Sequence, residues 1–236
     1  MSRSKILGLV LLALVSLFSC TARQDLRLDL GNSANLSLNL SLDSFFLRYL
    51  QDLGAGGDNQ PVFDLVAITQ AMTELGIEVR QIRAPELGRL ELEMRVPDPE
   101  AIARDRLGLA QFITWRRGTG NSELTITLNQ EIIRRIMGTT SLVREEGFEF
   151  LLPLPGSSVQ GYQDDLIWIF EEYEPADSLE RAFGRATIEI DIFTPRDIIS
   201  SQGPGLVRRD PRRATLTLGV LDALTFSGSR SYRLSY

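Results

Sequence analysis

The chain contains no histidine, one lysine and one cysteine among its 236 residues. Without an imidazole, the Ser-His-Asp and Cys-His arrangements cannot be built from this chain. Lys5 and Cys20 both lie in the first twenty residues, so the rest of the chain has no lysine for a Schiff base, a Ser-Lys pair or a P-loop. These absences exclude most catalytic devices that work near neutral pH, and they leave carboxylates, tyrosines and hydroxyl groups.

Long apolar runs are also scarce, and the longest one follows a positively charged start. Arg3 and Lys5 precede an apolar run over 6–18, which is 13 residues long. A helix that spans a membrane needs about 20 such residues. A short apolar run behind a positive start is typical of an export signal.

The end of this run, LVSLFSC, predicts how the signal is removed. Lipoprotein signals carry an apolar residue three places before a cysteine and a small residue directly before it, and Leu17 and Ser19 fit. We therefore expect cleavage between Ser19 and Cys20, with Cys20 as the lipid attachment residue that carries palmitate or a similar acyl chain. Two other readings of Cys20 stay open, which are ordinary cleavage after Ala22 and a buried free thiol. Thr21, which is not the Asp that retains some lipoproteins at the inner membrane, favours the outer membrane.

The charge balance bears on possible partners. Removing residues 1–19 takes Arg3 and Lys5 away and changes the formal charge from −6 to −8. An acidic domain of this size can bury one good core and is a poor candidate for nucleic-acid binding. With a single cysteine, the chain cannot form an intrachain disulfide.

The segment after the leader predicts a hairpin and two helices. Leucine alternates at 26, 28 and 30 and again at 36, 38, 40 and 42, around the turn-forming triplet 31–33. Such alternation is typical of a β-hairpin with one apolar face. Helices are favoured over 44–53 and over 63–76, where apolar residues recur at helical intervals until Gly76.

Strand patterns dominate the remainder. They fall at 77–82, 89–96, 112–115, 124–128, 185–195, 214–224 and 231–236, with short helices expected at 97–108 and 131–137. This order predicts an α+β fold, a mainly antiparallel sheet with a few short helices packed on one face. We expect a signal peptide over 1–19, a lipid-anchored tether over 20–25 and a single domain over 26–236. Within it, 139–182 is less regular and is interpreted as an insertion or a cover.

Carboxylates gather at three places, and none has the spacing of a calcium loop. Asp164 and Asp165 precede the apolar stretch 166–170, and the next acidic residues follow it, namely Glu171, Glu172 and Glu174. The flanking of an apolar stretch favours the two ends of a short helix or strand. Glu189 and Asp191 alternate with isoleucines, which predicts the solvated face of a half-buried strand. No metal site or cofactor is expected from these residues, although a catalytic carboxylate pair stays open as an alternative.

One local basic cluster stands out on this acidic chain. The segment 202–213 contains four arginines, namely Arg208, Arg209, Arg212 and Arg213. Arginines close to a membrane can contact the phosphates of lipid headgroups. The alternative is a solvated hairpin loop, for which such a charged segment is ordinary.

The order of these patterns resembles LppM-type bacterial lipoproteins. The features that carry the resemblance are the lipoprotein signal, the hairpin broken by NSAN, a helix ending in ELGIEV, and the segments MRVPDPEAIA, ATIEIDIFTPRDIISSQG and ATLTLGVLDAL. The resemblance covers most of residues 20–236. It implies a membrane-tethered α+β domain of the cell envelope that binds lipid or lipid-linked glycans, and it carries over one residue, the lipid acceptor Cys20.

Together these observations predict a non-catalytic envelope lipoprotein, in the periplasm or at the cell surface, anchored in the membrane. We expect the domain to bind a lipid, an amphipathic ligand or a partner protein close to that membrane. The alternatives are a structural envelope protein without a ligand and a carboxylate-dependent hydrolase of envelope glycans. An apolar space of ligand size would favour binding over the structural alternative.

Overall fold

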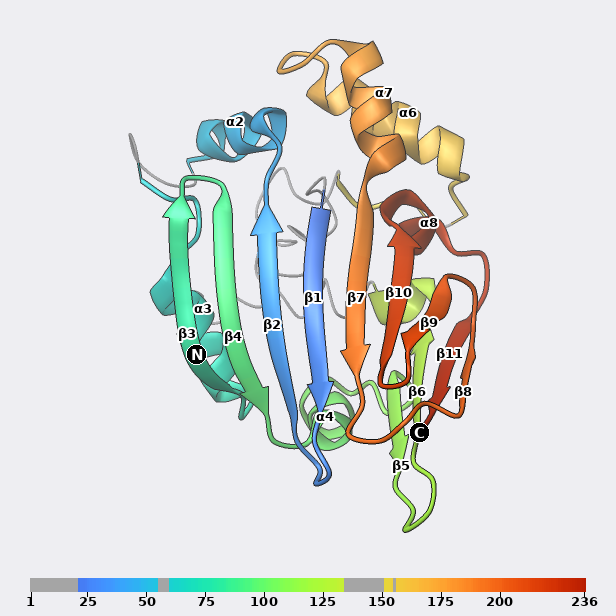
Figure 1. The fold of residues 1–236 in the computed structure, drawn as a ribbon. Helices are drawn as coiled ribbons and strands as arrows, with labels where there is room; N and C mark the ends of the chain where they lie inside the picture. Colours follow the sequence, from blue (N-terminus) through green and yellow to red (C-terminus); the bar gives the residue numbers. More distant parts are fainter. Residues whose placement is uncertain (1–20, 55–59, 134–150, 155) are drawn as a thin grey trace.

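The computed structural model describes residues 21–54, 60–133, 151–154 and 156–236, and these form an α+β fold with two β-sheets (Figure 1). Sheet A has seven strands in the order β3-β4-β2-β1-β7-β10-β9, and sheet B has four in the order β5-β6-β11-β8. The bounds in sheet A are β3 Glu78–Glu86, β4 Arg89–Val96, β2 Ala34–Ser41, β1 Thr21–Leu28, β7 Thr187–Phe193, β10 Arg213–Gly219 and β9 Leu206–Asp210. Those in sheet B are β5 Ile113–Arg116, β6 Glu123–Leu128, β11 Arg230–Ser235 and β8 Ser200–Gln202.

The predicted hairpin forms the centre of sheet A. Strand β1 pairs antiparallel with β2, with Leu26 opposite Leu36, and parallel with β7, with Leu26 opposite Ile192. The other described pairs of both sheets are antiparallel. This confirms the α+β class with mostly antiparallel strands. Residues 21–25, predicted to be a tether, lie within β1, so the sheet begins one residue after Cys20.

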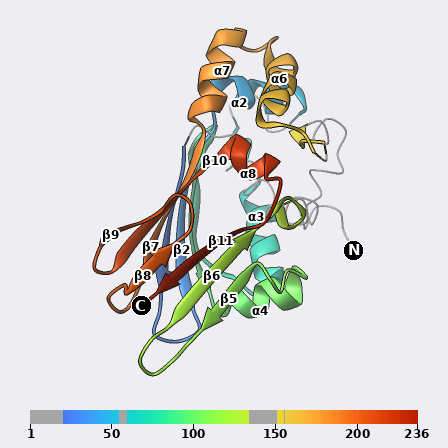
Figure 2. The same cartoon turned by 90° about the vertical axis from the view of Figure 1, so that its right-hand side faces the viewer.

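Three of the described helices begin at residues whose side chains accept backbone hydrogen bonds. Their bounds are α2 Ser44–Asp52, α3 Leu65–Glu74, α4 Pro99–Ala101, which continues as a π-helical turn over Ile102–Arg106, α6 Val159–Phe170, α7 Ala176–Arg185 and α8 Val220–Thr225. Asp64, Asp98 and Ser158 accept from the N–H group three residues later and so cap α3, α4 and α6. Figure 2 shows the helices and sheet B on the same side of sheet A.

The interior contains two groups of buried apolar side chains. One group lies between sheet A and the helices, where Phe170 of α6 contacts Phe45, Phe46 and Tyr49 of α2 with ring centroids 5.1 to 5.8 Å apart. The other lies between sheets A and B and includes Trp115, whose indole N–H donates to the Tyr236 hydroxyl at 2.6 Å. Both buried groups therefore pack against the same face of sheet A.

The described part of 139–182 includes α6 and the start of α7, helices that pack on the end of sheet A. Two other segments differ from the sequence predictions. The segment 202–213 contains strand β9, so the predicted loop is an edge strand of sheet A. The predicted strand over 214–224 ends at Gly219 and continues as α8, because Val220, Leu221, Ala223 and Leu224 are buried together only in a helical turn.

Candidate functional site

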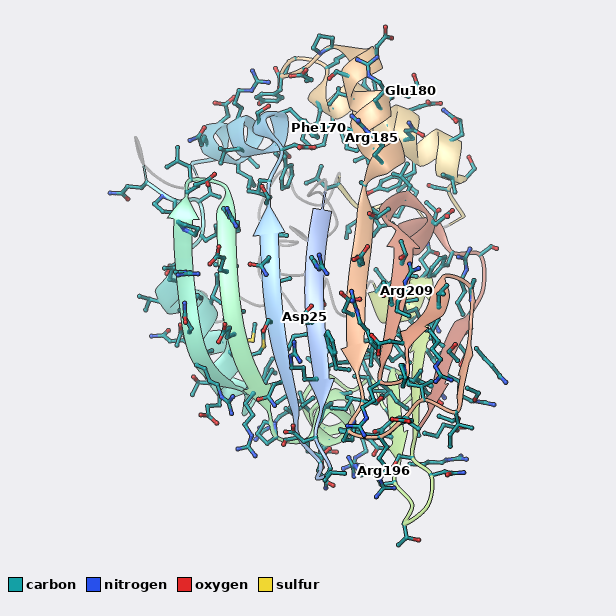
Figure 3. All side chains as sticks on the ribbon, viewed as in Figure 1. Asp25, Phe170, Glu180, Arg185, Arg196 and Arg209 are labelled. Atoms are coloured by element: carbon teal, nitrogen blue, oxygen red, sulfur yellow. The ribbon has the colours of Figure 1, made fainter. Side chains whose placement is uncertain are left out.

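The outer face of sheet A, turned toward the viewer in Figures 1 and 3, is polar and is covered by no described element. Asp25 of β1 and Arg209 of β9 lie on the strands of this face (Figure 3). Ion pairs join neighbouring side chains there, for example Arg95 with Glu78 at 3.9 Å and Arg89 with Glu91 at 3.2 Å. Much of the charge on this face is therefore paired within the sheet.

Asp191 is the most constrained group on the outer face, because its side chain is only 1% exposed. Arg213 donates two hydrogen bonds to its carboxylate, at 3.0 and 2.7 Å, and Arg23 and Thr215 donate one each, at 3.1 and 2.7 Å. Burial alone would raise the pKa of Asp191. The hydrogen bonds from Arg213, Thr215 and Arg23 outweigh that effect and lower the pKa from 3.8 to about 2. The sequence places Asp191 on the correct face but wrongly predicts that solvent surrounds it.

The four arginines of the predicted basic cluster do not form one free patch. Arg213 is committed to Asp191, Arg212 donates to Asp197 at 2.9 Å, and Arg208 donates to the backbone carbonyl of Asp210 at 3.2 Å. Arg209 lies on the exposed edge strand β9. Headgroup contact by these residues stays a prediction, and Arg213 is its weakest member because its charge is already neutralised.

The acidic residues around 166–170 lie on exposed surface of α6 and of the turn after it. Asp164 and Asp165 are exposed, and Gln160 donates to Asp164 at 2.9 Å. Glu174 pairs with Arg48 of α2 at 3.2 Å. In the described part of the chain, no three carboxylates are grouped in a way that could hold a metal ion. These side chains give the helices at the end of sheet A a polar surface, and the Arg48–Glu174 pair joins α2 to the turn after α6.

Two depressions that described residues form are polar. One, of about 460 Å³, lies between the β5–β6 turn and β8 and is lined by Arg116, Arg117, Ser122 and Ser200, among others. The other, of about 100 Å³, lies on the outer face beside Ser37 and Glu91. Neither has the predominantly apolar lining that a site for an acyl chain requires.

The inner face of sheet A has an unusual centre. Central strands should be the most buried part of a covered sheet, yet Leu26 and Leu36 of the hairpin and Ile188 and Ile190 of β7 are only half-buried. We call these four residues the central strip. Leu40 and Leu90 on the same face are at most 1% exposed, and Leu38 and Ile192 beside the strip are 2% exposed, so half-buried and fully packed positions alternate at the centre of the inner face.

A polar residue interrupts the central strip. Gln24 lies on the inner face, opposite Leu38 on one side and Ile190 on the other, and it is half-buried. An amide left unpaired in a dry core costs about 1 to 3 kcal/mol. Its place among leucines and isoleucines is therefore consistent with access of solvent to this part of the interior. The sequence holds this signal, because Gln24 breaks an otherwise apolar alternation.

Two residues lie between the two buried groups, Ile188 on β7 of sheet A and Leu128 on β6 of sheet B. Both pack, half-buried, against the group under the helices and against the group between the sheets. The strip therefore lies where the two cores meet, and it combines apolar side chains with incomplete burial. Of the regions described, this one fits an apolar or amphipathic ligand best.

Ser19 and Cys20, the predicted cleavage and lipid-attachment residues, lie outside the described residues. The strand that follows them, β1, starts at the end of sheet A where α2 and α7 lie (Figure 1). Among the described helices, none has both the length and the apolar character needed to cross a bilayer.

Comparisons with known proteins give one distant likeness. No family model matches the chain, and no curated protein matches it. Among solved structures, the NMR structure of the folded domain of LppM from Mycobacterium tuberculosis is similar in part, with a TM-score of 0.38 and 10% sequence identity. The match covers 92% of this chain and 89% of that one. The neighbour is an LppM domain, the kind of protein that the sequence patterns resemble.

Proposed function

We propose that this chain is a non-catalytic bacterial envelope lipoprotein, anchored at Cys20, whose domain holds an acyl chain against the central strip. The observation that carries the proposal is the half-buried state of Leu26, Leu36, Ile188 and Ile190 at the middle of a seven-stranded sheet. Burying such side chains further against a ligand is favourable by about 25 cal/mol for each Å² removed from water.

Binding is also the function that suits the available side chains. The chain has no histidine, and its lysine and cysteine precede residue 21. The carboxylate with the most strongly lowered pKa, Asp191, is fully engaged with two arginines and a threonine, so it is not available as a general base. This supports a carrier or receptor for an amphipathic ligand over a hydrolase.

The test is lipid extraction and mass spectrometry of the full chain purified from its own membranes. Ile190→Trp places a bulky side chain on the strip itself, and Val207→Trp adds the same side chain to the exposed strand β9, where Val207 is 48% exposed. We expect wild type and Val207→Trp to carry stoichiometric lipid and Ile190→Trp to carry several-fold less. Equal lipid in all three proteins, or none in any of them, would contradict the proposal.

The anchor has its own test. Metabolic labelling with a palmitate analogue should label the wild type and leave Cys20→Ala unlabelled and released from the membrane. The proposed outer-membrane location predicts that the labelled protein fractionates with outer-membrane markers. Equal labelling of both proteins would rule out Cys20 as the attachment residue.

A further inference from the structure

Arg230 is a cation on the inner face of sheet B that has no acidic partner among the described residues. Residues 230, 232 and 234 of β11 alternate with exposed neighbours, and Tyr232 and Leu234 are buried on this face. Arg230 is half-buried, and its guanidinium lies 4.0 Å from the centre of the Phe226 ring. No carboxylate of the described residues forms an ion pair with it. Arg233, on the opposite face of the same strand, pairs with Glu123 at 3.6 Å.

Tyr232 places a second unsatisfied group beside Arg230. The side chain is 2% exposed, and its hydroxyl has no well-formed hydrogen bond among the described residues. Burial raises the pKa of Tyr232, whereas the positive charge of Arg230 and a hydrogen-bonding contact with its guanidinium lower it. A poorly satisfied buried hydroxyl costs up to about 1 to 3 kcal/mol, which an acceptor on a ligand would recover.

The neighbours of this pair are the apolar residues where the two cores meet. Arg230 lies opposite Leu128, and Tyr232 lies opposite Ile126, both half-buried. Leu128 packs against the same two buried groups as Ile188, which belongs to the central strip. Figure 2 shows sheet B inclined to sheet A, with the layers diverging toward the start of β11, where Arg230 lies.

We propose that Arg230 and Tyr232 bind the carboxylate of a long-chain fatty acid whose tail lies along the central strip. The proposal rests on the function proposed above and names its ligand class. One guanidinium and one hydroxyl neutralise a single charge and supply donors to both oxygens of a carboxylate. A doubly charged phosphate would call for further cations, and the described inner face offers none beside Arg230.

The experiment compares two ligands that differ only at the head. The full chain, kept soluble in a non-ionic amphipathic polymer, is photolabelled with a diazirine analogue of hexadecanoate while unlabelled hexadecanoate or hexadecanol competes. We expect wild type to prefer the acid and Arg230→Gln to lose about 10- to 100-fold in apparent affinity for the acid alone. Tyr232→Phe should lose about 3- to 10-fold. Arg230→Lys should recover part of the loss, because it keeps the charge.

Arg233→Gln is the matched control, since it removes an arginine from the outer face of the same strand, and its affinity should stay within about twofold of wild type. Circular dichroism melting of each variant separates loss of binding from loss of folding. If acid and alcohol bind equally to wild type, or if Arg230→Gln weakens both to the same degree, the head-group assignment is wrong while the proposed function stands. If neither ligand competes at all, the proposed function fails with it.

Discussion

The two faces of sheet A differ in how their polar groups are satisfied. On the outer face, the buried carboxylate of Asp191 receives four hydrogen bonds from Arg213, Arg23 and Thr215. On the inner side, Gln24 lies among apolar residues, and the buried Tyr232 hydroxyl has no well-formed hydrogen bond among the described residues. The polar groups of the outer face are thus satisfied within the protein, whereas those of the inner side are less well satisfied.

This difference shows that a high density of charge is a poor guide to a binding site here. Exposed and paired arginines contribute little beyond solvation. A site needs groups that a ligand can satisfy better than the protein does. By that criterion the inner side of the molecule, with the central strip, Arg230 and Tyr232, is the stronger candidate.

The largest effect should come from the packed part of the inner face. Phe170 is fully buried among four aromatic rings, so Phe170→Ala should lower the free energy of unfolding by about 3 to 5 kcal/mol. Ile190→Ala, in the half-buried strip, should cost about 1 kcal/mol in ligand-free protein. Urea denaturation measures both. Equal losses would mean that the strip is as well packed as the core under the helices.

The next effect concerns the outer face. Asp191→Asn leaves Arg213 and Arg23 without a counter-charge, and it should lower the free energy of unfolding by about 2 to 3 kcal/mol, since both arginines reach solvent and are partly rehydrated. Asp25→Asn is the control on the same face, because its pair with Arg27 is exposed and contributes at most about 0.5 kcal/mol. A loss no larger than that of Asp25→Asn would show that the Asp191 network stabilises little.

The pH dependence follows from the same residue. The pKa of Asp191 is lowered from 3.8 to about 2 in the folded state, so its stabilisation is present above pH 4 and is lost as the pH falls through about 2. Between those values wild type should lose stability more steeply than Asp191→Asn. Thermal melts of both proteins from pH 7 to pH 2 test this, and parallel curves would contradict the assignment.

The smallest effect should come from Tyr232. Tyr232→Phe removes a buried hydroxyl that has no well-formed hydrogen bond among the described residues, so ligand-free stability should be unchanged or rise by up to about 1 kcal/mol. Tyr236→Phe is the matched control, because it removes the acceptor of the 2.6 Å bond from Trp115 and should cost about 1 to 2 kcal/mol. A loss for Tyr232→Phe as large as that for Tyr236→Phe would indicate that its hydroxyl is satisfied in the folded protein.

Local patterns in the sequence predict most elements of the fold. Alternating leucines predict the hairpin of β1 and β2, and helical spacing up to Gly76 predicts α3, whose end adopts a φ of +80°. Local patterns do not show which strands become neighbours, so the parallel pairing of β1 with β7 and the division into two sheets could not be predicted. For the same reason, 214–224 resembles a strand throughout, although tertiary packing turns its second half into α8.

The candidate site was less predictable than the fold. Asp191 lies on β7, and its partners come from two other strands, β1 and β10, of which β1 is distant in the sequence. Gln24 could have been noticed as a break in an apolar alternation. Arg230, in contrast, is an ordinary arginine in the sequence, and its importance depends on the register that places it opposite Leu128.

The most direct test of a ligand site on the inner face uses two neighbouring positions on β7. In a Cys20→Ser background, Ile190→Cys places the only thiol on the inner face, and Glu189→Cys places it on the outer face. The rate of maleimide labelling is measured with and without hexadecanoate. We predict that hexadecanoate slows labelling of Ile190→Cys at least about tenfold and leaves Glu189→Cys unchanged. Unchanged labelling of both, or equal protection of both, would contradict a site on the inner face.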